Sequence, residues 1–139
     1  MSAHANTYVP KSRVAKWFES RLPLVGLVHS SFVAFPVPEH QLQAMGHYTA
    51  SVAVHSDLRL VALTAPRGNR FFIWDLDSGE ARLDAPLPDC AGVGAVADGF
   101  VVTSGQGRCR YYDCRQTNLV AKPLELPAGL WDNHLHLMA

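Results

Sequence analysis

The sequence predicts an all-β chain made of four-stranded antiparallel meander blades, a partial β-propeller of about two and a half blades. Three observations support this prediction. Short runs of β-branched and aromatic residues alternate with turn residues throughout 48–88. The same order of runs and turns returns in 91–127. Matching positions, such as Thr64 and Thr103 or Pro88 and Pro127, are 39 residues apart.

The repeat divides the chain into units that can be taken in order. The expected units are a flexible tail at 1–12 and a single β domain at 13–139, in which 13–38 is a partial blade, 48–88 and 91–127 are blades, and 130–137 is the first strand of a next blade. The 13–38 segment is expected to supply the last three strands of its blade. A chain with so few blades leaves sheet edges open, which favours self-association.

Local signals assign the elements before the first full blade. Leu24–Val28 and Phe32–Phe35 are apolar runs separated by three residues, which predicts a hairpin. Glu39–Met45 is expected to form the helical turn, and Gly46 is expected to close it in the left-handed conformation.

Bulk composition excludes two classes of partner. The chain has 139 residues, a formal net charge of zero and 48% hydrophobic residues. A neutral chain lacks the basic footprint that nucleic acids or anionic membrane surfaces require. No apolar run reaches the roughly 18 residues of a membrane span. We therefore expect a globular protein with neither a nucleic-acid partner nor a membrane span.

The three cysteines do not predict a disulfide framework, because their number is odd. Cys109 and Cys114 are five residues apart, so they would point to opposite faces if both lay on one strand. We expect Cys90, Cys109 and Cys114 to be small apolar residues or free thiols.

Six segments together carry a resemblance to a known family: Pro23–Leu27, Tyr48–Val52, Ala65–Gly68, Trp74-Asp75, Gly99–Gly105 and Trp131–Leu135. They resemble the C-terminal half of a bacterial propeller family known as domain of unknown function 1513. The resemblance covers roughly 13–139. It implies a seven-bladed ring, export to the periplasm by a twin-arginine signal, and genes nearby for iron uptake. The N-terminal residues of this chain lack the pattern of a secretory signal. The family has no assigned catalytic residues to transfer.

Blade geometry selects one face for function. In a four-stranded meander, the loop between the second and third strands lies on the same face as the connection between blades. That face is expected to contain 66–69, 89–90 and 131–134, and scaffolds place functional residues on such loops. The candidate ligand-binding residues are Arg67, Asn69, Asp132, Asn133 and His134. Arg67 could bind a carboxylate or phosphate through two parallel hydrogen bonds, although an arginine at this position more often ties one blade to the next.

A second interpretation is a metal-binding or redox-associated protein in a periplasmic iron-uptake context. His134 and His136 alternate on one strand and would share a face, and Asp132 or His47 could complete the ligand set. His29, His40 and His55 fall at expected turns, so we expect them to be solvated. The cofactor remains unassigned, and no nucleophile lies in a catalytic pattern, so a non-enzymatic binding or scaffold module is the favoured function.

Overall fold

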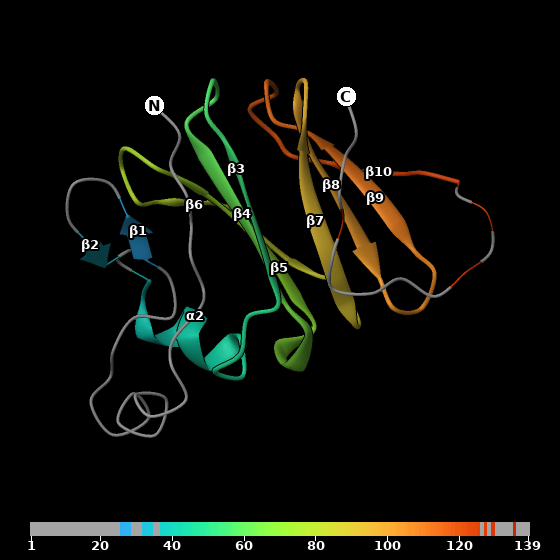
Figure 1. Cartoon of the computed structure of the whole chain (residues 1–139), viewed down its shortest axis with the longest axis horizontal. Helices are drawn as coiled ribbons and strands as arrows, with labels where there is room; N and C mark the ends of the chain where they lie inside the picture. The colour runs from blue at the N-terminus through green and yellow to red at the C-terminus, as the bar shows by residue number, and fades with distance from the viewer. Residues whose placement is uncertain are drawn as a thin grey trace.

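The computed structural model describes residues 26–28, 32–34 and 37–125, together with residues 127, 129 and 135. Two four-stranded antiparallel sheets stand side by side in this part of the chain, and a hairpin and a short helix flank the first of them (Figure 1). The strands of each sheet follow one another in chain order, so each sheet is a meander. The predicted all-β class with four-stranded meander blades is confirmed.

The elements before the first sheet follow the local signals. Strands β1 (Gly26–Val28) and β2 (Phe32–Ala34) form the expected antiparallel hairpin. Helix α2 (Glu39–Ala44) ends as predicted at Gly46, whose φ of 62° is a left-handed value that glycine adopts without strain. The 1–12 tail, residues 13–25, 29–31 and 35–36, and most of 130–137 lie outside the described residues.

The two sheets occupy the repeated part of the chain. The first contains β3 (Ser51–His55), β4 (Leu60–Ala65), β5 (Arg70–Asp75) and β6 (Ala81–Pro86), with the 3-10 helix η1 (Pro66–Gly68) between β4 and β5. The second contains β7 (Cys90–Val96), β8 (Gly99–Ser104), β9 (Cys109–Asp113) and β10 (Ala121–Pro123). Prolines at the ends of β6 and β10 suit outermost strands, since proline donates no ladder hydrogen bond.

Backbone hydrogen bonds show that the sheets are equivalent position by position. In the first sheet, the Leu76 N–H donates to the Arg59 carbonyl over 2.9 Å. In the second, the Cys114 N–H donates to the Asp98 carbonyl over 2.8 Å. Arg59 therefore corresponds to Asp98 in position. The two side chains have opposite charges, so the residue types do not indicate this correspondence.

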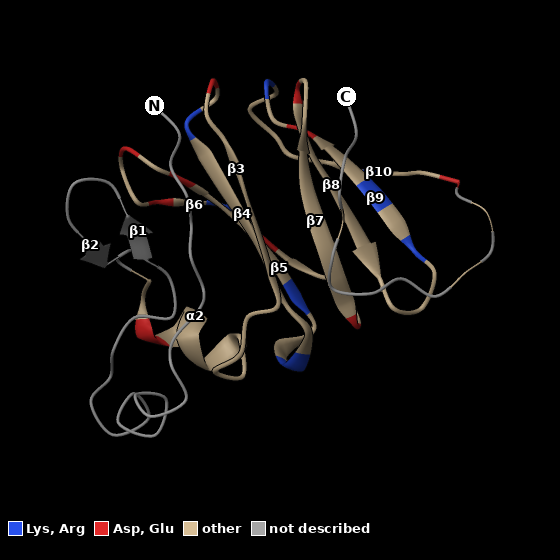
Figure 2. Ribbon diagram, viewed as in Figure 1, with Lys and Arg blue, Asp and Glu red and all other residues tan. Residues whose placement is uncertain are grey.

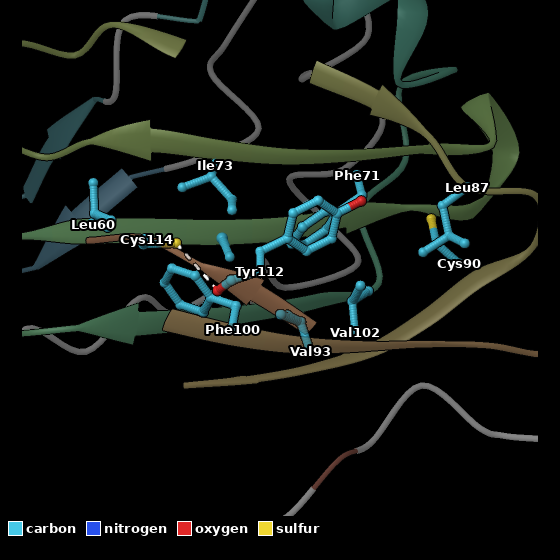
Figure 3. Packing of buried hydrophobic residues seen from close by; sticks show 11 residues of the cluster. Leu60, Phe71, Ile73, Leu87, Cys90, Val93, Phe100, Val102, Tyr112 and Cys114 are labelled. Atoms are coloured by element: carbon cyan, nitrogen blue, oxygen red, sulfur yellow. Dashed lines mark hydrogen bonds between the residues drawn. The ribbon is translucent and has the colours of Figure 1, made fainter. Parts of the chain in front are cut away.

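The main core lies between the sheets, because alternate side chains of each strand point into the gap (Figure 3). Ile73 and Phe71 of the first sheet meet Phe100 and Tyr112 of the second, and all four are buried. The Phe71 and Tyr112 ring centroids are 5.3 Å apart. Burial of one such side chain contributes about 1.5–3 kcal/mol, so this interface holds the sheets together as one body.

A second cluster covers the opposite face of the first sheet. Phe72 and Trp74 stack with centroids 5.1 Å apart, and the end of α2 lies over them through buried Met45. The Trp74 indole N–H donates to Oε1 of buried Gln41 over 3.1 Å. Helix α2 thus both covers apolar surface and satisfies a buried donor.

Polar side chains fix the position of one sheet against the other. Where β3 and β4 face β7, Thr64 Oγ1 donates to the Ala91 carbonyl over 2.7 Å, and the Val93 N–H donates to Ser51 Oγ over 3.2 Å. At β6, Arg82 donates to the Gln116 carbonyl of the second sheet, and Arg110 of the second sheet donates to the Pro86 carbonyl. The most extensive strand contact between the two sheets is that of β3 with β7.

Candidate functional site

The loops predicted to share a face lie together in the described residues. The Asp89 N–H donates to Asn69 Oδ1 over 2.9 Å, and the Gly105 N–H donates to the Asp89 carbonyl over 2.8 Å. A Cβ built at Gly46 would touch Cβ of Arg67 at 3.0 Å. We call this surface, made of residues 46–48, 66–69, 89–90 and 105–107, the loop face.

Arg67 is the exposed cation of η1, and its surroundings fix its position. A Cβ at Gly68 would overlap the Ala44 carbonyl oxygen, so only glycine lets the end of α2 approach η1 this closely. The Arg67 guanidinium carbon lies 4.8 Å from the ring centroid of Tyr48, which is 37% exposed. Among the described residues, no carboxylate forms an ion pair with Arg67. Tyr48 therefore covers the flat face of the guanidinium, and its N–H groups have no hydrogen-bond partner among the described residues.

Asn69 also has a structural role, because it closes η1, and the sequence analysis did not predict this role. Its φ of 51° places it in the left-handed region, which asparagine tolerates, and its N–H closes η1 on the Pro66 carbonyl over 3.0 Å. Its side-chain oxygen accepts from Asp89, so the Asn69 amide NH2 group is the part left for a ligand. Asp89 also has a left-handed φ, 53°, and is exposed.

The metal-binding prediction rests mainly on residues outside the described part of the chain. Asp132, Asn133, His134 and His136 all lie there. His47 is exposed on the loop face with a φ of 52°. Within the described residues, no group of three or more His, Cys, Asp or Glu side chains could hold a metal ion. The proposed ligand set thus stays a prediction.

The three cysteines are free and buried, as expected. Cys90 Sγ donates to the Arg70 carbonyl over 3.0 Å, and burial raises the pKa of this thiol to about 11. Burial likewise raises the pKa of Cys114 to about 11 and that of Cys109 above its usual value. Raised pKa values keep all three as neutral thiols near neutral pH, so none is poised for thiolate chemistry.

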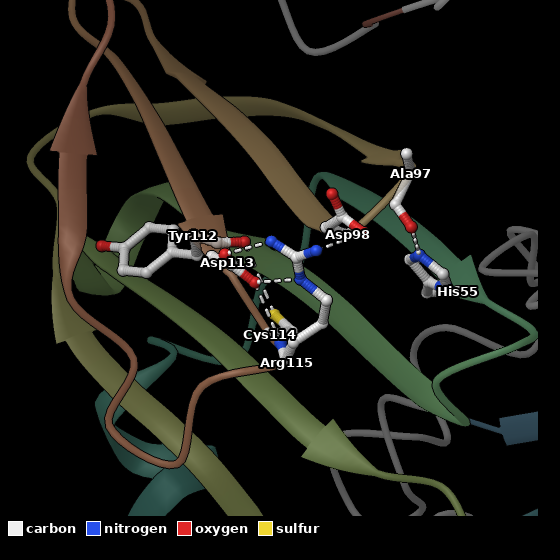
Figure 4. A network of polar contacts seen from close by, with 7 residues as sticks. All are labelled: His55, Ala97, Asp98, Tyr112, Asp113, Cys114 and Arg115. Carbon is white, nitrogen blue, oxygen red and sulfur yellow. Dashed lines mark hydrogen bonds and ion pairs between the residues drawn. The ribbon is translucent and has the colours of Figure 1, made fainter.

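His55 was expected to be solvated, and this prediction is wrong. The residue is buried at the end of β3 and its Nε2 lies 3.1 Å from the Ala97 carbonyl of the second sheet (Figure 4). Its Nδ1 accepts from the Leu58 N–H over 3.3 Å, which places the ring proton on Nε2. His40, in contrast, is exposed as expected.

Ion pairs organise this same end of the sheets (Figure 4). Arg115 donates from Nε and Nη2 to the two oxygens of Asp113, and its Nη1 lies 3.3 Å from Asp98. Hydrogen bonding to Arg115 lowers the pKa of Asp113 to about 2. Figure 2 shows Lys/Arg and Asp/Glu at both ends of the sheets, with neither sign confined to one end.

The fold and the loop face together define a propeller-type module. The structure of Saccharomyces cerevisiae Sqt1, a propeller-type protein, matches 69% of this chain with a TM-score of 0.52 and 10% identity. The chain spans 27% of the length of that protein, and the likeness concerns the fold alone.

A family model covers almost the whole sequence. Residues 13–138 match the family described as "Protein of unknown function (DUF1513)", and the chain belongs to this family. A second match joins 33 residues to cytochrome b/c1 of Bradyrhizobium diazoefficiens at 52% identity. It covers 24% of this chain and 5% of that protein, a stretch too short to define a shared fold or activity. No helix in the described residues is long and apolar enough to cross a membrane.

Proposed function

We propose that the protein is a propeller-type binding or scaffold module whose loop face recognises an acidic ligand through Arg67. The observation that carries the proposal is the position of this side chain. Its guanidinium is held over Tyr48, and no described carboxylate pairs with it. Tyrosine and arginine are also the residue types that dominate binding energy at protein interfaces.

The second sheet shows that the turn itself does not need this arginine. The Asn69 N–H bonds to the Pro66 carbonyl, and the Gly107 N–H bonds to that of Ser104, each over 3.0 Å. By this correspondence, the counterpart of Arg67 is Gly105. The turn of the second sheet is one residue shorter and closes without a side chain at that position, so the closing hydrogen bond does not require Arg67.

The alternative role, a tie between blades, also finds little support. The described hydrogen bonds that cross between the sheets come from other side chains, such as Arg82 and Arg110. Arg67 instead contacts Tyr48, which precedes β3 of its own sheet. An anchored guanidinium with an open N–H edge suits the two oxygens of a carboxylate, and little side-chain entropy is lost when they bind.

The test compares two peptides, hexaglutamate and its uncharged counterpart hexaglutamine, by isothermal titration calorimetry. We expect hexaglutamate alone to bind, and Arg67→Ala to weaken binding about tenfold, the size of one good charged hydrogen-bonded contact. Arg67→Lys should also weaken it, because a lysine cannot form two parallel bonds. Arg59→Ala on the opposite face is the matched control. An equal loss of hexaglutamate affinity in the Arg59 and Arg67 variants would show that only the net charge of the protein matters, and would refute the proposal.

A further inference from the structure

A groove of about 250 Å³ opens at the other end of the sheets, opposite the loop face. Its lining comes from the innermost strands of both sheets, at the point where β3 and β7 reach their turns. The lining residues are Val54, His55, Ser56, Asp57, Ala95, Val96 and Ala97. The groove is a separate site from the one proposed above.

The turn that forms one wall departs from the repeat. In the first sheet, His55 pairs with Leu60, which leaves a turn of four residues, 56–59. In the second, Val96 pairs with Gly99, which leaves the two residues 97–98. The first turn is thus two residues longer than its counterpart. In repeat proteins, insertions confined to one repeat often build the binding face.

The longer turn is held rigidly, as a binding wall must be. The His55 ring uses both nitrogens, Nδ1 for the Leu58 N–H and Nε2 for the Ala97 carbonyl. The imidazole therefore joins the two walls of the groove. Its ring also meets Phe100 edge-on, with centroids 6.1 Å apart. A wall fixed from both sides loses little entropy when a ligand binds.

The electrostatics of the groove favour a cation. Asp57 supplies the one carboxylate in the lining, and the lining contains neither lysine nor arginine. Asp57 is exposed, and the described hydrogen bonds and ion pairs do not involve its carboxylate. The nearest cations on this end are engaged, Arg59 with Asp77 over 2.8 Å and Arg115 with Asp98 and Asp113. An arriving positive charge would thus meet Asp57 without displacing a partner.

We propose that this groove binds a small organic cation, an alkylammonium whose charged head pairs with Asp57. Ser56 Oγ lies next along the wall and can accept a hydrogen bond from the same head group. The short alkyl part of the ligand packs on the apolar lining of Val54, Ala95 and Val96. The volume of about 250 Å³ suits a ligand of a few carbon atoms. Because the groove is open to solvent, we expect an affinity of about the millimolar range.

The test titrates n-butylammonium into the 15N-labelled protein at neutral pH and follows backbone amide signals. We expect shifts confined to 56–58 and 95–97. The neutral isostere 1-butanol should produce much smaller shifts at the same positions. Asp57→Asn should weaken the ammonium about fivefold, the size of one partly exposed ion pair.

Glu80→Gln is the matched control, because it removes one exposed carboxylate from the turn between β5 and β6, outside the groove lining, and no described ion pair involves it. It should leave the affinity unchanged, and the amide spectrum of each variant reports directly whether it is folded. Equal binding of butanol and butylammonium would reveal an apolar depression without charge selection and overturn the proposal. An unchanged affinity in folded Asp57→Asn, or shifts outside the groove, would do the same.

Discussion

One of the polar links between the two sheets is made by a buried hydroxyl group, that of Thr64. Its Oγ1 accepts the Ser51 N–H over 3.0 Å and donates to the Ala91 carbonyl over 2.7 Å. The pairing of β7 with β8 is irregular between Cys90 and Val93, so Ala91 lies outside the regular pairing. Thr64→Val keeps the shape of the side chain and its preference for strands, but removes both bonds.

The cost follows from what the substitution leaves unpaired. Thr64 is fully buried, so the Ala91 carbonyl loses a partner that water cannot readily replace. A buried unsatisfied group costs about 1–3 kcal/mol. The Ser51 N–H belongs to a partly exposed residue and adds less. We expect Thr64→Val to lower the free energy of unfolding by about 2–3 kcal/mol.

Urea unfolding followed by tryptophan fluorescence measures this change, provided the slope with denaturant stays constant. Thr64→Ser retains the hydroxyl and should recover most of the loss. Thr117→Val, at an exposed turn, should stay within about 0.5 kcal/mol of the unmodified protein. If Thr64→Val were no more harmful than Thr117→Val, the hydroxyl would not be what joins the sheets.

Two further predictions follow from the pKa shifts. Because burial raises the thiol pKa values of Cys90 and Cys114 to about 11, a disulfide reagent at pH 8 should label them far more slowly in the native protein than in denaturant. Equally fast native labelling would contradict this burial. Asp113 has its pKa lowered to about 2 by Arg115, so its contribution is present above pH 4 and is lost as pH falls towards 2. Asp113→Asn should therefore flatten the fall of the urea midpoint over that interval, and an unaltered fall would assign it to other groups.

Much of the fold could be read from the sequence because turns and strands repeat in a fixed order. Thr64 and Thr103 even perform the same local task, each accepting an N–H of the first strand of its own sheet. Tyr111 and Tyr112 are adjacent on β9, so period-two alternation places them on opposite faces, and only Tyr112 enters the core. Strand order, turns and side-chain alternation each depend on residues that are close in the sequence, so the sequence pattern predicts them.

The sites could be predicted only in part, because they depend on distant contacts. The loops of the loop face followed from meander geometry, yet the stacking of Arg67 on Tyr48 joins residues from separate elements. His55 looked solvated because its sequence neighbours are turn residues. Its hydrogen-bond partner Ala97 lies 42 residues further along the chain, and its ring meets Phe100 of the second sheet. The difference in turn length that builds the groove becomes visible only once strand register is known.

The repeat preserves geometry more faithfully than residue type, and one ion pair makes this testable. Arg59 pairs with Asp77 in the first sheet, and the corresponding pair in the second is Asp98 with Arg115, so the charges are exchanged. If position rather than sign matters, Arg59→Asp should destabilise the first sheet by placing two carboxylates together.

Adding Asp77→Arg to that variant should then restore stability by recreating the order found in the second sheet. Arg59 has a φ of 54°, which aspartate tolerates better than arginine, so Arg59→Asn serves to separate that backbone effect from charge. A double-mutant cycle measures the coupling, which should shrink as salt is raised because both partners are exposed. Zero coupling at low salt would mean that the ion pair contributes nothing to stability. The geometry of the turn would then be set by the backbone hydrogen bond from the Leu76 N–H to the Arg59 carbonyl.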